Sequence, residues 1–198
     1  MTAAGPSGLF LHASAAAVGG RAALFLGHST SGKSTIVRLL EPRCPKLADD
    51  SVHAARGADG VWRVVDGGFR LGSGRGVADW MEEVRRRAAD GAAAVPLGAC
   101  FRLHKAAEVR VEPLEPVELA RHLMDAAMEI DLQRKFGRIA RGTKPEPDSQ
   151  EQVVAMRRHW FAQVAQIARI CPGWHLFFTR DADPAQLASV LEKTGHFS

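Results

Sequence analysis

The stretch Gly27–Thr35, GHSTSGKST, matches the pattern G-x-x-x-x-G-K-[ST]. This pattern is typical of a P-loop, in which backbone N–H groups surround the phosphates of a nucleotide. An apolar run before it, Ala22–Leu26, predicts a buried strand, and the apolar spacing of Ser34–Leu40 after it predicts a helix. Because strand, loop and helix form the context that a P-loop requires, the sequence predicts nucleotide binding here.

Each residue type in this loop has a chemical reason to be there. Glycine at Gly27 and Gly32 lets the main chain approach the phosphates with no Cβ in the way. The amine of Lys33 would reach the outer phosphates as a point charge, and the hydroxyl of Ser34 would coordinate Mg²⁺. The expected cofactors are therefore ATP and Mg²⁺, and the sequence leaves GTP or pyrophosphate open as the donor in place of ATP. The expected nucleotide-binding residues are Gly27, His28, Ser29, Thr30, Ser31, Gly32, Lys33, Ser34 and Thr35.

Two adjacent aspartates, Asp49 and Asp50, follow a short apolar run in LADDSV. A magnesium triphosphate needs a carboxylate near the metal, and phosphoryl transfer needs a group that orients the acceptor hydroxyl. Neighbouring residues of an extended segment point to opposite sides, so one aspartate can face the metal and the other the acceptor. The alternative is an Asp pair that only opens a surface turn. The position shortly after the P-loop helix favours the site.

The rest of the chain predicts one α/β domain over residues 1–198. Further strands are expected at Leu9–His12, Val52–Ala55, Val61–Val65, Cys100–His104, Glu108–Val111 and Trp174–Thr179. Further helices are expected at Val77–Ala89, Glu115–Ala140 with an optional break near Gly137, Gln150–Ile170 and Pro184–Lys193. Because hairpin-like and crossover-like connections both occur, a mixed sheet is expected. Asp66–Gly76 suits an active-site loop or a plain surface connection, and Arg141–Ser149 suits a flexible linker.

Composition excludes several classes of protein. Lys and Arg number 26 against 22 Asp and Glu, and no long run of one charge appears, so no nucleic-acid partner is expected. No stretch of about 18 apolar residues predicts a membrane span. The spacing of Cys44, Cys100 and Cys171 fits neither a disulfide framework nor a zinc site, so a reducing, cytoplasmic location is expected. A cleaved signal peptide is rejected because its removal would damage the fold.

Three pieces of the sequence, in order, resemble the catalytic domain of HPr kinase/phosphorylase, which phosphorylates a serine of the bacterial transport protein HPr. They are His12 in LHAS, the loop with its short helix, and Asp49 and Asp50 in LADD. The resemblance implies the mixed-sheet nucleotide-binding core that this family shares with ATP-dependent phosphoenolpyruvate carboxykinases. The segment VPLGACFRLHK resembles later parts of such chains more loosely.

The resemblance also implies roles for single residues. Lys33 and Ser34 would hold the phosphates and the magnesium ion. Asp49 would be the catalytic base, Asp50 the magnesium ligand, and His12 the catalytic neighbour that tunes Asp49. An imidazolium beside a carboxylate favours its ionised form, which keeps the base competent near neutral pH. The resemblance assigns the Asp pair as a unit, and the order of its two roles stays open.

The resemblance implies a kinase that transfers the γ-phosphoryl group of ATP to a serine of a protein or peptide. Thr35 replaces an acidic residue of HPr kinases, and their N-terminal domain is missing. The chain therefore resembles shorter relatives that phosphorylate precursor peptides at least as well. HPr kinases form oligomers, so the resemblance also allows a homo-oligomer. A kinase of a small hydroxy compound, such as a free amino acid, and an ATP-binding sensor or assembly module without transfer remain alternatives. His104 and Lys105 face either the ligand or alternate sides of a strand.

Overall fold

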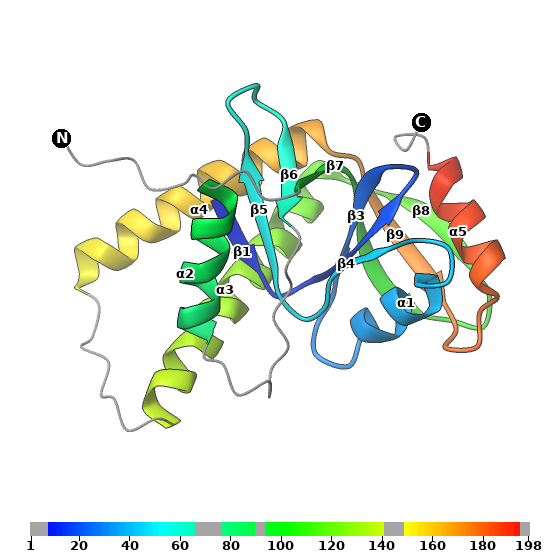
Figure 1. Cartoon of the computed structure of the whole chain (residues 1–198), viewed down its shortest axis with the longest axis horizontal. Coiled ribbons are helices and arrows are strands. Elements are labelled where there is room, and N and C mark those ends of the chain that lie inside the picture. The colour runs from blue at the N-terminus through cyan, green and yellow to red at the C-terminus, as the bar shows by residue number, and fades with distance from the viewer. Residues whose placement is uncertain (1–7, 66–76, 90–93, 141–148, 195–198) are drawn as a thin grey trace.

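The computed structural model describes residues 8–65, 77–89, 94–140 and 149–194. Nine strands are formed within these residues: β1 (Gly8–Leu11), β2 (Ser14–Val18), β3 (Arg21–Leu26), β4 (Lys46–Ala48), β5 (Val52–Arg56), β6 (Trp62–Val65), β7 (Ala94–Lys105), β8 (Arg110–Leu114) and β9 (Gly173–Phe178). The helices of the same residues are α1 (Lys33–Leu40), α2 (Val77–Ala89), α3 (Pro116–Ala140), α4 (Gln150–Ile170) and α5 (Pro184–Lys193). Figure 1 shows their arrangement.

The strands form one mixed sheet with the order β1-β5-β6-β7-β3-β2-β4, and β9 pairs with both β7 and β8. The long strand β7 holds the sheet together, because its first residues pair antiparallel with β6 and its later residues pair parallel with β3 and β9. Parallel pairing sets Leu26, the last residue of β3, beside Arg102 of β7. The predicted mixed sheet is confirmed, and the site forms where β3 ends.

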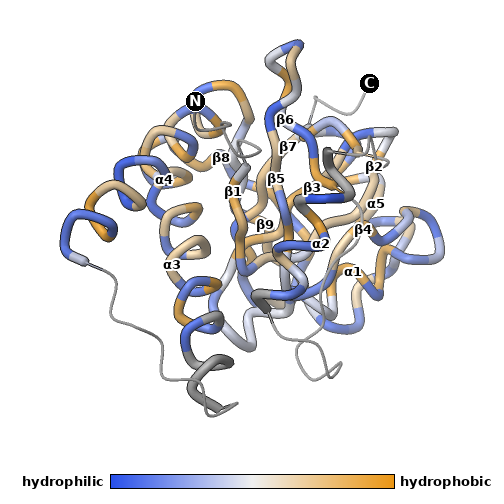
Figure 2. Tube along the Cα trace, turned by 60° about the vertical axis from the view of Figure 1, so that its left-hand side comes forward, coloured by the Kyte–Doolittle hydropathy of each residue, from blue (hydrophilic) through white to orange (hydrophobic). Residues whose placement is uncertain are grey.

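Helices cover both faces of the sheet. On one face, α3 and α4 pack through a buried cluster that includes Leu24, Leu123 and Ile167. On the other face, α1 and α5 pack through a cluster that includes Phe25 and Ile36. Alternate residues of β3 serve the two clusters, as a strand buried on both faces requires. Figure 2 shows this as apolar colour along the central strands and alternating colours on the helices.

Helices with strong periodicity lie where the sequence predicts them: α2, α4 and α5 have the predicted bounds. The predicted hairpin is confirmed as the antiparallel pair β5 and β6. The optional break near Gly137 is wrong, because α3 continues to Ala140; one glycine costs a helix only about 1 kcal/mol, which packing offsets. Strand β7 begins at Ala94, well before the predicted Cys100. The predicted loop Asp66–Gly76 and most of the predicted linker lie outside the described residues.

Strands β2 and β4 are additions to the sequence-based prediction. Strand β2, SAAAV, pairs with β3 as a tight hairpin and with β4 on its other side. Alanine has low strand propensity and gives no clear alternation of apolar and polar residues, so the sequence carries no signal for this strand. As a result, Ser14 of β2 and Asp49, which directly follows β4, meet at the same edge of the sheet.

Two of the three cysteines meet in the core. The sulfur atoms of Cys100 and Cys171 lie 3.7 Å apart, and both side chains are buried as free thiols. The contact with Cys171 and burial raise the pKa of Cys100, which keeps this thiol protonated and unreactive.

Within the described part of the chain, no helix is long and apolar enough to cross a membrane.

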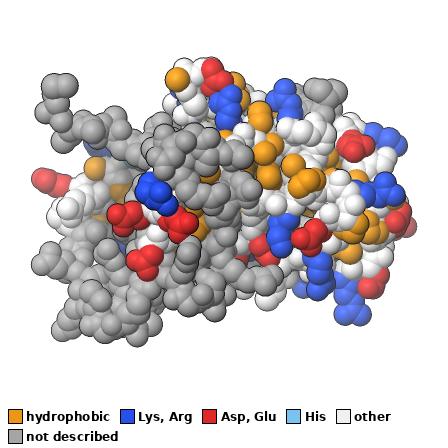
Figure 3. Space-filling model, viewed as in Figure 1, with side chains coloured by type: hydrophobic (Ala, Val, Ile, Leu, Met, Phe, Trp, Pro, Cys, Tyr) orange, Lys and Arg blue, Asp and Glu red, His pale blue; other side chains and the backbone are white. Residues whose placement is uncertain are grey.

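Charges of both signs are mixed on the surface. On the face in Figure 3, Lys and Arg side chains alternate with Asp and Glu side chains over the described residues near α1 and α5. Glu41 and Lys46, with 3.8 Å between their charged atoms, are one such pair. Exposed pairs of this kind contribute little to stability, so the fold depends on its buried clusters.

Replacement of Leu123 by alanine should lower the free energy of unfolding by about 2–5 kcal/mol, because Leu123 is fully buried between α3 and the sheet and its truncation leaves a cavity. Urea denaturation followed by circular dichroism measures the change. The control is Val117→Ala on the same helix, where the side chain is 84% exposed and the expected change is within about 0.5 kcal/mol. Equal losses in the two variants would contradict the assigned packing of α3.

Candidate functional site

The loop between β3 and α1 contains two residues with left-handed backbone conformations. Gly32 has a φ of 104°, and a Cβ added there would lie 2.7 Å from the Phe178 ring, so only glycine fits. Thr30 also has a positive φ, 69°. Gly32 caps α1 without a side-chain hydrogen bond, which leaves N–H groups of the first turn without a side-chain acceptor. These groups and the positive end of the helix dipole favour an anion.

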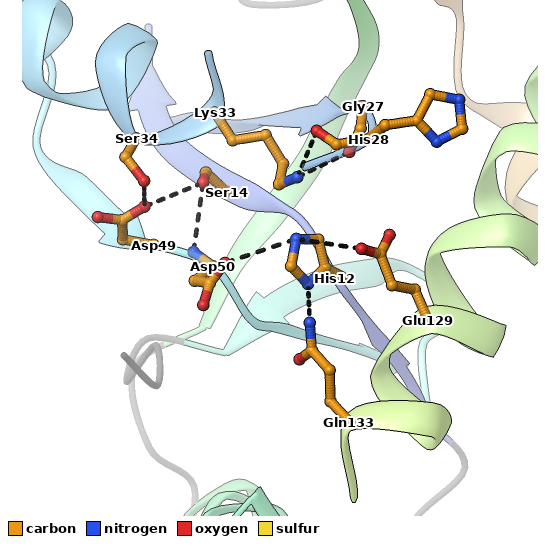
Figure 4. A network of polar contacts seen from close by, with 10 residues as sticks. All are labelled: His12, Ser14, Gly27, His28, Lys33, Ser34, Asp49, Asp50, Glu129 and Gln133. Carbon is orange, nitrogen blue, oxygen red and sulfur yellow. Dashed lines mark hydrogen bonds and ion pairs between the residues drawn. The ribbon is translucent and has the colours of Figure 1, made fainter. Parts of the chain in front are cut away.

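Lys33 points back across this loop. Its side chain is only 5% exposed, and its amine donates hydrogen bonds to the carbonyl oxygens of Gly27 at 2.7 Å and His28 at 3.1 Å (Figure 4). Burial lowers the pKa of Lys33. Nearby carboxylates oppose this shift, and Glu129 has the largest effect among them. The loop therefore holds a partly desolvated cation beside its free N–H groups.

Ser34 and Asp49 form the first polar pair of the site. The Ser34 hydroxyl donates to Oδ1 of Asp49 at 2.8 Å, and the Ser14 hydroxyl donates to the same oxygen at 3.2 Å. Hydroxyl and carboxylate oxygens are ligands that suit Mg²⁺. Among the described residues, no group of three or more His, Cys, Asp or Glu side chains could hold a metal ion by itself. A Mg²⁺ ion at Ser34 and Asp49 would therefore complete its coordination with water and phosphate oxygens.

Asp50 and His12 form the second polar pair. Oδ1 of Asp50 lies 3.5 Å from Nε2 of His12, and the backbone N–H of Asp50 donates to the Ser14 hydroxyl at 3.3 Å. The His12 side chain is 5% exposed and also lies 3.8 Å from Oε1 of Glu129. The amide nitrogen of Gln133 lies 2.6 Å from Nδ1 of His12. With this amide donating, Nδ1 accepts and the proton of the neutral imidazole sits on Nε2, facing Asp50.

The pairing differs from the one inferred from resemblance. The resemblance set His12 beside Asp49, with Asp50 on the metal, whereas the structure sets His12 beside Asp50 and Ser34 beside Asp49 (Figure 4). Asp49 is the residue directly after β4, and its side chain points toward Ser34 in the first turn of α1. Asp50 has a φ of 73°, a left-handed conformation that turns its side chain toward the end of β1. The two aspartates thus contact different side chains, Ser34 for Asp49 and His12 for Asp50.

A cavity of about 430 Å³ lies against His12, Lys33, Ser34 and Asp50. It is lined by His12, Ser29, Thr30, Gly32, Lys33, Ser34, Thr35, Asp50, Glu129 and Gln133. A second cavity of about 400 Å³ shares Thr30, Gly32 and Thr35 with it. The remaining lining of the second cavity is Lys105, Ala106, Phe178, Thr179 and Arg180. The loop thus separates an acidic cavity from a basic and partly aromatic one.

The predicted site residues otherwise lie together around the loop. Gly27 and His28 contribute the carbonyl groups that bind Lys33. The buried Ser31 hydroxyl has no hydrogen-bond partner among the residues that the structure describes. Lys105 reaches the second cavity, whereas His104 points to the opposite face and hydrogen bonds with His175. Alternation along β7 explains the difference.

Glu129 and Gln133 of α3 are site residues that sequence reasoning missed. They lie four positions apart, so they share one face of the helix. That spacing alone is common on solvated helices. Only the packing of α3 against β1 shows that this face meets His12.

The fold and the site define an α/β protein in which a glycine-rich loop and two acidic residues surround a polar cavity at the end of a central strand. The family described as SynChlorMet cassette protein ScmC matches residues 1–181, and the chain belongs to this family. A comparison with curated proteins found no match. Among solved structures, the Hpr(Ser) kinase/phosphatase from Coxiella burnetii is distantly similar, with a TM-score of 0.41, 11% sequence identity, and coverage of 93% of this chain and 95% of that chain.

Proposed function

We propose that this protein is a Mg²⁺- and ATP-dependent kinase that transfers the γ-phosphoryl group to a serine hydroxyl of a protein or peptide. One observation carries the proposal: Lys33, Ser34 and the His12–Asp50 pair line one cavity, and Asp49 accepts a hydrogen bond from Ser34 beside it. A phosphate site, a cation site and a candidate base are the parts that phosphoryl transfer needs. ATP as the donor also suits a cytoplasmic protein.

The two cavities offer a path for the nucleotide across the loop. The phosphates would bind at the uncapped start of α1 and at Lys33. The nucleoside would occupy the second cavity, where Phe178 supplies an aromatic ring and Lys105 and Arg180 supply positive charge. Thr30, Gly32 and Thr35 line both cavities, so a nucleotide bound across the loop would contact both of them.

Ser34 and Asp49 are the residues that would hold Mg²⁺. Their two oxygens lie 2.8 Å apart at the start of α1, and both are of the hard type that this ion prefers. A bound Mg²⁺ ion would neutralise charge on the phosphate oxygens. Ser14 donates to the same carboxylate and so fixes its orientation from the other side.

Asp50 is the proposed base. Its carboxylate takes the proton of the serine hydroxyl as the serine oxygen bonds to the γ-phosphorus atom and the bond from that atom to the bridging oxygen breaks, which releases ADP. His12 positions this carboxylate with its Nε2 proton, and Gln133 fixes the imidazole from the other ring nitrogen. The amine of Lys33 stabilises the negative charge on the phosphoryl oxygens.

The proposal is tested by incubating the purified protein with γ-labelled ATP, Mg²⁺ and serine-containing peptides, including those encoded in the same cassette. Label should appear on a peptide as phosphoserine. Label that appears only as free phosphate, with every peptide tried, would leave ATP hydrolysis as the activity and contradict peptide transfer. Label on a small hydroxy compound in place of a peptide would identify the other acceptor class.

A further inference from the structure

Arg102 is a half-buried cation beside the loop, and it forms no hydrogen bond or ion pair with any residue that the structure describes. One of its guanidinium nitrogens lies 3.0 Å from the point where a Cβ on Gly27 would be, and the Gly27 carbonyl accepts a hydrogen bond from Lys33. A guanidinium group has five N–H donors in a planar fork, a geometry that suits bidentate binding of a carboxylate. An anion from outside the described chain would satisfy them.

A polar stripe on α3 connects Arg102 with the proposed catalytic pair. The stripe consists of Glu118, His122, Asp125, Glu129 and Gln133, which are spaced three or four positions apart and so share one helix face. Its last two members contact His12. Burial lowers the pKa of Arg102. Among the neighbouring charges, the carboxylate of Asp125 has the largest effect on this pKa, and it opposes the lowering. The stripe therefore runs from the catalytic pair past Arg102.

Histidines surround the far end of this stripe. Arg102 and His104 share one face of β7 because they are alternate residues, and Arg102 is in register with His175 of β9. The rings of His104 and His175 hydrogen bond at 2.9 Å. Glu118 of α3 lies 3.5 Å from His122 and 3.9 Å from His175. Four side chains with nitrogen donors or acceptors thus lie between the sheet and α3: those of Arg102, His104, His175 and His122.

Arg102 is the permanent charge of this group. Burial lowers the pKa of both His104 and His122, so their imidazoles are mainly neutral near pH 7 and act there as hydrogen-bonding groups. Glu118 already serves two of the histidines and Arg121. The guanidinium group of Arg102 is left without an acceptor among the described residues.

We infer that Arg102, with His104 and His122 beside it, forms a subsite for a carboxylate of the acceptor peptide. The inference rests on the proposed function and specifies its substrate class: a serine peptide with an acidic residue near the acceptor. At about 1.5 Å per helical residue, Asp125 lies about 6 Å along α3 from Glu129, and His122 lies about 10 Å from it. An extended peptide advances about 3.3 Å per residue, so the carboxylate belongs about two or three residues from the serine. A free amino acid is too short to reach both places.

The test uses fluorescein-labelled peptides with one serine and one aspartate placed two or three residues to either side, each with a matched peptide that has asparagine instead. Fluorescence anisotropy measures binding to the full chain without any transfer. For at least one position, the aspartate peptide should bind about tenfold more tightly or better, since hydrogen bonds to charged groups contribute about that much. In Arg102→Gln this preference should fall below about twofold.

Charge reversal gives a readout that a merely structural role would not move. Arg102→Glu should prefer the matched peptide with lysine at the same position. Arg102→Lys should keep part of the preference for aspartate, because it keeps the charge but not the planar fork. The control is Arg21→Gln, an exposed arginine at the opposite end of β3, which should bind all peptides as the unmodified chain does.

Three results would overturn the inference. The first is equal binding of the aspartate and asparagine peptides at every position. The second is no binding of any serine peptide. Arg102→Gln could instead weaken binding of a fluorescent ATP analogue, which would assign Arg102 to the nucleotide. Failure of the proposed function is separate: absence of ATP binding or of labelled peptide would leave the anisotropy comparison intact.

Discussion

Asp50→Asn should lower the rate of phosphoryl transfer by about 10²–10⁴-fold while ATP affinity stays within about threefold, which is the range expected for loss of a general base. The asparagine keeps the shape of the side chain and its place beside His12 but cannot take the proton. Steady-state transfer to a peptide acceptor and binding of a fluorescent ATP analogue measure the two effects. A variant with unchanged transfer would remove Asp50 from the mechanism.

Asp49→Asn is the matched comparison, because the same change in chemistry is made one residue away. Asp49 contacts Ser34 rather than His12, so its replacement should raise the Mg²⁺ concentration needed for half-maximal activity. Excess Mg²⁺ should restore part of the rate in Asp49→Asn and none in Asp50→Asn. The opposite pattern would restore the order of roles inferred from resemblance. Asp59→Asn, in the turn between β5 and β6, should leave both properties unchanged.

Residue patterns that are local in sequence predicted this structure well. The strand, glycine loop and helix around Lys33 need only adjacent residues, and the periodicity of α4 and α5 fixes their bounds. The Asp pair could be singled out as a candidate because two acids after the loop helix are a local signal. The mixed sheet followed from the mixture of connection types.

The missing parts depend on contacts between distant residues. His12 lies beside Asp50, whose positive φ is a conformation that no pattern of apolar residues encodes. Glu129 and Gln133 belong to the site only because α3 packs against β1. Arg102 reaches the loop only because β7 is the parallel neighbour of β3. In each case the residue type is visible in the sequence, but its partner is set by sheet order and helix packing.

Lys33→Met should weaken binding of ATP with Mg²⁺ by at least about 100-fold. Methionine keeps the apolar stem of the side chain but removes the charge, while Glu129 and Asp50 stay close enough to repel phosphates. A ligand at 100 times its Kd stabilises a protein by about 2.7 kcal/mol, so the rise in Tm that ATP produces should disappear. Lys46→Met, at an exposed lysine of β4, should keep this rise.

The same lysine predicts a dependence on pH. Burial lowers the pKa of Lys33 in the free protein, so the amine loses its proton at a lower pH than an exposed lysine does. A bound phosphate would raise this pKa again, and by linkage ATP affinity should fall as the pH rises through the lowered value. Calorimetric titrations over the alkaline range measure this fall, which should be absent in Lys33→Met. An affinity that does not change with pH in the unmodified chain would show that the Lys33 amine takes no part in holding the phosphates.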